Sequence, residues 1–304
     1  MIMAMTTVKP GKRVDLDTDI PRAVGYHKSA RGRVADIAAY LLLIILTLGF
    51  LLPFYLMIRN GLSTRAEITS PEWTIFPADP QWENLTTLFT DPDIPMASSL
   101  VNSSIIAIGT TIGTLLFCSL AGYGLARIPN RAANAIFYAI VATLMIPAAV
   151  TFVPSFIIVS TLGWVSDFRG LIIPGLFSGF TTFLFRQYFL GFPKELEEAA
   201  RVDGLGYWRT FWRIVFPNSG AFFAAIAVIT FIGSWNSFLW PLIVAQDQSS
   251  WTVQVTLSTF ITAQTINIPL LFMAAVVSIL PLVFVFVFLQ RFLVAGVAQT
   301  GIKG

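Results

Sequence analysis

The chain has 304 residues, of which 56% are hydrophobic and only 12% are charged. Soluble domains carry about 25% charged residues, so this composition excludes an ordinary water-soluble enzyme and favours a protein that crosses a membrane several times. The single cysteine excludes a disulfide framework within the chain, and with one histidine there is no Cys/His cluster to hold zinc. We therefore expect an all-α polytopic membrane protein without a metal site.

Windows without charged residues predict six membrane-spanning helices, because about 20 apolar residues cross the hydrocarbon core. The fourth window is short, so its helix must extend past Arg186, whose long side chain can reach the interface. The first half of the last window is polar, so we expect a loop outside the membrane there, with room for a surface helix, and Pro269 in the first turn of the sixth helix. In chain order, the windows are residues 37–58, 94–126, 132–166, 170–185, 214–246 and 248–290.

The distribution of basic residues orients these helices. Six spans place both termini on one side, and assigning that side to the cytoplasm puts 16 of the 19 Lys and Arg residues in cytoplasmic segments. The net charge of +3 is therefore a topology signal rather than a nucleic-acid-binding patch. The expected divisions are a cytoplasmic tail (1–34), the first helix with an extracytoplasmic loop (35–95), a five-helix core (96–290) and a second cytoplasmic tail (291–304).

The predicted spans carry no ionisable residue near their middle, and the only histidine, His27, lies in the N-terminal tail. Intramembrane ionisable groups are costly and usually functional, so their absence argues against a proton-driven carrier and an intramembrane protease. The sequence also lacks a phosphate-binding loop. We expect no catalytic residue in this chain, and active transport would need energy from a partner.

The longest predicted cytoplasmic loop, between the fourth and fifth helices, has a patterned sequence. Pro193 suits the first turn of a short helix, and the acidic residues Glu195, Glu197 and Glu198 favour its N-terminal end. Gly204 is expected to end this helix in a left-handed conformation. The pattern predicts a stiff helix, followed by a second amphipathic segment over residues 205–213.

Residues 193–217 resemble the EAA loop of permease subunits of binding-protein-dependent ABC importers. In that loop Glu-Ala-Ala is followed by three residues and Gly, then nine residues and Ile, then one residue and Leu-Pro. Phe216 stands where the family usually has Leu. The matching positions are Glu198, Ala199, Ala200, Gly204, Ile214 and Pro217.

Segments 182–189, 235–241, 290–296 and 301–304 are similar to the carbohydrate branch of this family, in particular to the six-helix, maltose-transporter-type second permease. The similarity covers roughly residues 37–304. The run Ala298-Gln299-Thr300 departs from the expected Leu-Thr-Ala-Gly, which leaves a contact between the C-terminal tail and the ATPase in doubt.

The resemblance implies the type I ABC importer permease fold in a bacterial or archaeal plasma membrane, with lipid around the helices. The chain would be a transport subunit, not an enzyme, and would bind no cofactor. Its expected partners are a second homologous permease, an extracytoplasmic solute-binding protein and two ATPase subunits that use ATP and Mg, with no nucleic acid among them.

The resemblance also implies that the EAA helix couples ATP hydrolysis to transport. In the family this helix sits in a groove of the ATPase subunit and moves with it. Glu198 is expected to contact the ATPase surface, Ala199 and Ala200 to fit the groove, and Gly204 to hold the bend that follows. Asp203, Ile214 and Pro217 complete the expected coupling site.

The substrate path is the least defined feature of the sequence. Asn236, flanked by Trp235 and Trp240, can line a sugar path or serve equally well in interhelical hydrogen bonding. Pro147 and Pro154 are either kinks at gating positions or ordinary irregularities of the third span. The expected solute is a sugar or sugar-like molecule; the alternatives are glycerol phosphate or a polyamine in the same architecture and, more remotely, an independent carrier or channel.

Overall fold

The computed structural model describes residues 30–261 and 266–300, which are mostly helical. Within these ranges the only β structure is one isolated bridge between Ile261 and Ile266. The chain divides into two units, residues 1–53 and 54–304. Of the predicted tails, residues 1–29 and 301–304 lie outside the described residues, and the backbone of 291–300 continues the last helix.

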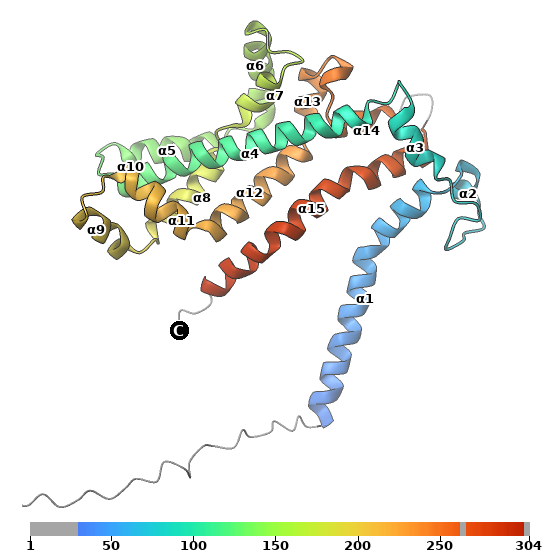
Figure 1. The fold of residues 1–304 in the computed structure, drawn as a ribbon, viewed down its shortest axis with the longest axis horizontal. Helices are drawn as coiled ribbons and strands as arrows, with labels where there is room; N and C mark the ends of the chain where they lie inside the picture. Colours follow the sequence, from blue (N-terminus) through green and yellow to red (C-terminus); the bar gives the residue numbers. More distant parts are fainter. Residues whose placement is uncertain (1–29, 262–265, 301–304) are drawn as a thin grey trace, which may run out of the picture. The chain divides into compact units, whose positions relative to one another are not determined.

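The helices carry the labels of Figure 1. In chain order they are α1 (Ala30–Gly61), α2 (Arg65–Thr69), α3 (Glu83–Thr90), α4 (Met96–Arg127), α5 (Ala133–Thr143), α6 (Ala148–Thr161), α7 (Phe168–Ile172), η1 (Ile173–Gly175), α8 (Gly179–Leu190), α9 (Lys194–Val202), α10 (Tyr207–Thr210), η2 (Phe211–Val215), α11 (Phe216–Asn218), α12 (Gly220–Trp235), α13 (Leu239–Val244), η3 (Gln248–Ser250), α14 (Val253–Thr259) and α15 (Ile268–Thr300).

The first unit is formed by α1 as far as Pro53. The helix is apolar around its whole circumference, as in the run from Leu41 to Leu46, and these side chains are exposed. An exposed helix that is apolar on every side suits a lipid environment rather than water. The sequence therefore forms a helix here because lipid can solvate all of its faces.

In the second unit, α4 packs along α8 and α12, and α15 packs on the other side of α12 (Figure 1). Small residues allow the close approach of α4 and α8. A Cβ atom added at Gly122 would lie 2.6 Å from Cβ of Phe185 and 2.9 Å from the backbone nitrogen of Arg186. Backbones that approach this closely are typical of helix pairs in membranes, where van der Waals packing rather than the hydrophobic effect drives association.

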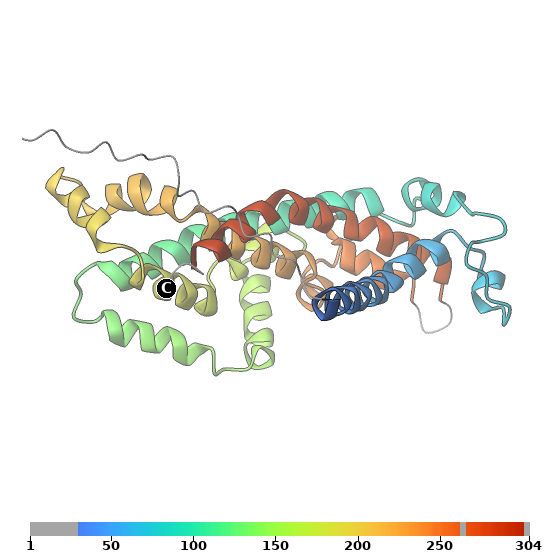
Figure 2. The ribbon, with the colours of Figure 1, turned by 90° about the horizontal axis from the view of Figure 1, so that it is seen from below.

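By length and composition, three helices can each cross a membrane alone, namely α4, residues 36–61 of α1 and residues 268–290 of α15. Three further candidates are bent pairs: α5 with α6 at 97°, α7–η1 with α8 at 43°, and α10–α11 with α12 at 81°. Figure 2 shows α5 and α6, in green, running nearly at right angles. The predicted number of six is reached if each bent pair is one span.

The break in the third window lies at Pro147, which immediately precedes α6, whereas Pro154 lies inside that helix without ending it. Proline lacks the N–H that would continue the hydrogen bonding of α5, so the chain changes direction there. Of the two prolines, only Pro147 therefore lies at a kink in the third predicted span.

The polar segment after α13 folds back onto α4. Polar side chains of α4 hold it: Ser99 Oγ lies 2.6 Å from Thr256 Oγ1, and the Val253 amide donates to Ser103 Oγ at 2.8 Å. Asn102 Nδ2 donates to two backbone carbonyl groups of the segment, at 2.8 and 3.0 Å. The segment predicted as a loop thus contains a short helix, α14, whose side chains Val253 and Thr256 are fully buried.

Candidate functional site

The predicted EAA helix is α9, which begins directly after Pro193 and has acidic residues in its first turn. Gly204 follows the helix with φ at +77°. The Leu205 amide donates to the Ala200 carbonyl and the Gly204 amide to the Arg201 carbonyl, both at 2.9 Å. This pair of bonds is the Schellman arrangement, in which a left-handed residue ends the helix. The predicted conformation of Gly204 is confirmed.

The two faces of α9 differ in exposure. Glu197 and Ala200 are only 3% exposed and face the interior of the chain. Glu198, Ala199 and Asp203 are exposed, and Val202 exposes 88% of its surface. Ala200 therefore packs within its own chain, whereas Ala199 is exposed.

Beyond Gly204, the chain reaches α12 through α10, η2 and α11. Phe211 and Val215 of η2 are buried in an aromatic cluster with Tyr123 and Phe189. Ile214 is half-buried on the same turn. Pro217 is exposed in α11, just before the bend of 81° into α12. The residues that match the EAA spacing thus lie along one continuous stretch of chain from α9 to α11, just before α12.

Arg127, in the last turn of α4, is the residue of this site that the sequence reasoning missed. Its Nε atom lies 3.1 Å from Oε1 of Glu197, a distance that makes an ion pair, although the two atoms are not aligned for a hydrogen bond; both side chains are less than 10% exposed. Its guanidinium group also donates to the carbonyl oxygen of Phe192, immediately before α9. Burial raises the pKa of the Glu197 carboxyl group, and the charges of Arg127 and Arg201 oppose that rise.

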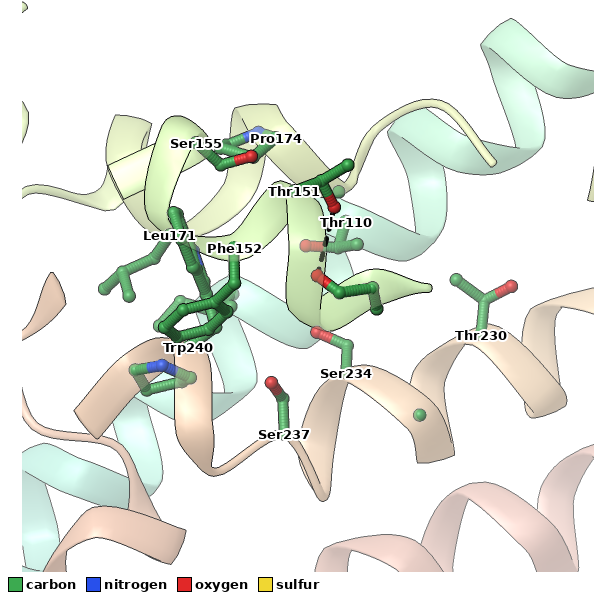
Figure 3. Close-up of a pocket in the computed structure, with 15 residues that line it drawn as sticks. Thr110, Thr151, Phe152, Ser155, Leu171, Pro174, Thr230, Ser234, Ser237 and Trp240 are labelled. Carbon is green, nitrogen blue, oxygen red and sulfur yellow. Dashed lines mark hydrogen bonds between the residues drawn. The ribbon is translucent and has the colours of Figure 1, made fainter. Parts of the chain in front are cut away.

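A second feature of the same unit is a cavity of about 420 Å³ among α4, α6, α7–η1, α12 and α13. Figure 3 shows hydroxyl groups and two aromatic rings around it. Phe152 and Trp240 meet edge to face with ring centroids 5.6 Å apart, and Trp240 Nε1 donates to the Gly170 carbonyl at 3.1 Å. The hydroxyl groups that line the cavity belong to Thr110, Thr151, Ser155, Thr230, Ser234 and Ser237.

None of the 15 lining residues is charged. Thr110 Oγ1 is buried without a hydrogen-bond partner, which leaves a polar atom unsatisfied beside the cavity. A charged ligand would need a countercharge in such a site, whereas a neutral polyhydroxyl ligand can pair with hydroxyl groups and stack on aromatic rings. Among the described residues no group of acidic, Cys or His side chains could hold a metal ion.

The predicted path residues take three different positions. Trp235 is 1% exposed, stacks on Phe231 and donates from Nε1 to the Ser278 carbonyl at 3.1 Å. Asn236 is exposed at the end of α12, and its Oδ1 accepts from Gln254 at 3.3 Å. Of the three, only Trp240 lines the cavity. The lining hydroxyl residues carried no distinctive signal, because Ser and Thr are common in membrane helices.

Three comparisons with known proteins show which family, relatives and fold the chain resembles. The family model for the binding-protein-dependent transport system inner membrane component matches residues 115–299. The arabinooligosaccharides transport system permease protein AraQ of Bacillus subtilis (strain 168) is 32% identical over 273 residues, which are 89% of this chain and 97% of that protein.

Two other relatives are named for different substrates. The sn-glycerol-3-phosphate transport system permease protein UgpE of Yersinia pestis is 32% identical over 278 residues, 88% of this chain and 98% of that protein. The lactose transport system permease protein LacG of Rhizobium radiobacter is 32% identical over 266 residues, 88% of this chain and 96% of that protein.

A solved structure shares the fold. It is described as the crystal structure of a bacterial ABC transporter involved in the import of the acidic polysaccharide alginate. The superposition has a TM-score of 0.76 at 22% identity and covers 87% of this chain and 98% of that chain. At this identity the likeness shows the fold alone.

Proposed function

Because the chain belongs to the family of binding-protein-dependent transport system inner membrane components, we propose a specific role for it within an ABC importer. It is a permease subunit in the inner membrane, and such a subunit works with a partner permease, an ATPase and a solute-binding protein. The role that we propose is import of a neutral sugar or oligosaccharide, with the cavity beside α4 as part of the path that the sugar takes.

The uncharged, hydroxyl-rich cavity is the observation that carries this proposal. Two relatives have sugars in their names, whereas UgpE has glycerol 3-phosphate. Burying a phosphate without a cation, or a polyamine without carboxylates, costs several kcal/mol. With no charged lining residue, the cavity favours the sugar over both alternatives.

The same proposal includes the topology. Each bent helix pair is one span, which gives six spans in all, and both termini lie in the cytoplasm. The excess of Lys and Arg in the assigned cytoplasmic segments supports this orientation. It places α9 on the cytoplasmic side, where an ATPase can reach its exposed face.

The exposed face of α9 is the proposed contact with the ATPase. Glu198, Ala199, Val202 and Asp203 present it, with Gly204 fixing the turn that follows. ATP and Mg bind to two ATPase subunits, and this chain binds no cofactor. Closure of those subunits would then move α9 and switch the helices between inward-open and outward-open packings.

Uptake by the reconstituted complex tests the substrate class. Proteoliposomes with all partner subunits should take up an arabino-oligosaccharide or lactose in an ATP-dependent manner, in preference to glycerol 3-phosphate and spermidine. Trp240→Ala should raise the KM for the sugar by about two- to tenfold, because one aromatic contact contributes about 0.5–1.5 kcal/mol. Trp240→Phe is the matched control that keeps an aromatic face. Uptake of glycerol 3-phosphate alone would refute the sugar assignment.

A further inference from the structure

α9 is held against the rest of the chain by its buried face, and Arg127 provides its only ion pair among the described residues. We propose that Arg127 is a positioning residue that transmits the movement of α9 to α4. This inference rests on the proposed function, since it assumes that α9 moves with an ATPase. It concerns the inward face of the helix, not the outward face that meets the partner.

Arg127 contacts both the start and the middle of the loop. Its guanidinium group donates to the Phe192 carbonyl, which precedes α9, and lies 3.1 Å from Glu197 inside α9. Both groups therefore stay close to the end of α4. The covalent link between α8 and α9 is the short non-helical segment 191–193, and the contacts of Arg127 add a direct connection from α9 to α4.

α4 is suited to carry the movement further, because it is one uninterrupted helix of 32 residues. Ile106 and Thr110 of the same helix line the cavity. At 1.5 Å per residue, Arg127 lies about 25 Å along the helix axis from Thr110. Because α9 contacts Arg127, a displacement of α9 would move α4. As one rigid helix, α4 would carry that movement to the proposed sugar path.

Burial makes this ion pair different from a surface pair. Exposed pairs contribute little, because water screens them and holding two side chains together costs entropy. Here the side chains of Arg127 and Glu197 are 8% and 4% exposed. Removing either partner would leave the other charge buried and unpaired. Arg201 adds a second connection to the neighbouring helix, since its guanidinium carbon lies 5.0 Å from the ring centre of Tyr207.

A double-mutant cycle on the full complex tests the inference. Arg127→Gln, Glu197→Gln and the double variant are reconstituted with all partner subunits, and ATP hydrolysis is measured with and without solute-binding protein. Each single variant should lower the stimulation by binding protein about two- to thirtyfold, as expected for residues that modulate coupling. Because the two groups act as a unit, the double variant should be no worse than the poorer single variant.

Arg131→Gln is the matched control, since Arg131 is exposed four residues further along and loses the same charge. Arg127→Lys, which keeps the charge and a donor, should recover part of the stimulation. Normal stimulation in both single variants, additive losses in the double variant, or failure of the complex to assemble would each overturn the positioning role. A wild-type complex that hydrolyses ATP but imports no sugar would count instead against the proposed substrate class.

Discussion

Replacing Gly204 distinguishes an effect of backbone conformation from an effect of side-chain size at the end of α9. Gly204 has φ at +77°, and a Cβ atom added there would meet no atom of the chain within 4 Å. Space therefore permits a Cβ atom, and the demanding feature is the left-handed conformation. For L residues it costs about 1–2 kcal/mol, less for Asn and more for β-branched residues.

From this cost we predict the order of activity in a series of variants. Ala should lower the equilibrium constant for forming the native left-handed turn at the end of α9 by about 5–30-fold, and Val should lower it further. Asn is larger than Ala but should be tolerated better. The assay is ATP hydrolysis stimulated by binding protein in the reconstituted complex, and the amount of complex in the membrane serves as the control.

An order that follows side-chain size, with Asn worse than Ala, would refute this reasoning. It would show that Gly204 is needed because a partner surface approaches it, rather than because the chain turns there. Equal activity of Gly and Ala would also contradict the conformational argument.

The remaining predictions concern packing and pH. Gly122→Ala places a Cβ 2.6 Å from a carbon of α8, so it should cost about 1–3 kcal/mol and lower the melting temperature in detergent, whereas at Gly124 a Cβ meets nothing within 4 Å and Ala should be neutral. Trp235→Phe removes the hydrogen bond to Ser278, so stability should fall by about 0.5–1.5 kcal/mol with the KM unchanged; a raised KM would place this ring on the sugar path. Burial raises the pKa of Glu197, so the folded state binds that proton more tightly than the unfolded chain does. Its contribution to stability is therefore present below the unfolded pKa of about 4.3 and is lost as pH rises through the folded pKa. The melting temperature of Glu197→Gln should therefore fall less than that of the wild type as pH rises. Parallel curves of melting temperature against pH for the variant and the wild type would contradict the assignment.

The sequence by itself determined the features that depend on local chemistry. Long apolar windows are helical because lipid leaves backbone groups no other partner, and α1, α4 and α15 lie within or across the predicted windows. The limits of α9 follow from Pro193, which precedes its first turn, and Gly204, which takes a left-handed conformation with little strain. The EAA spacing likewise identified the family without any knowledge of the fold.

Only the tertiary structure decided which side chains meet. Arg127 and Glu197 are 70 residues apart, and a basic residue at the end of an apolar helix is also what the membrane interface alone would select. The sequence likewise did not indicate that Trp235 is buried or which hydroxyl groups line the cavity. A helix that is apolar on all sides carries no amphipathic signal of its buried face. In a membrane, hydrophobicity determines that a segment is helical, whereas packing between helices determines what each face does.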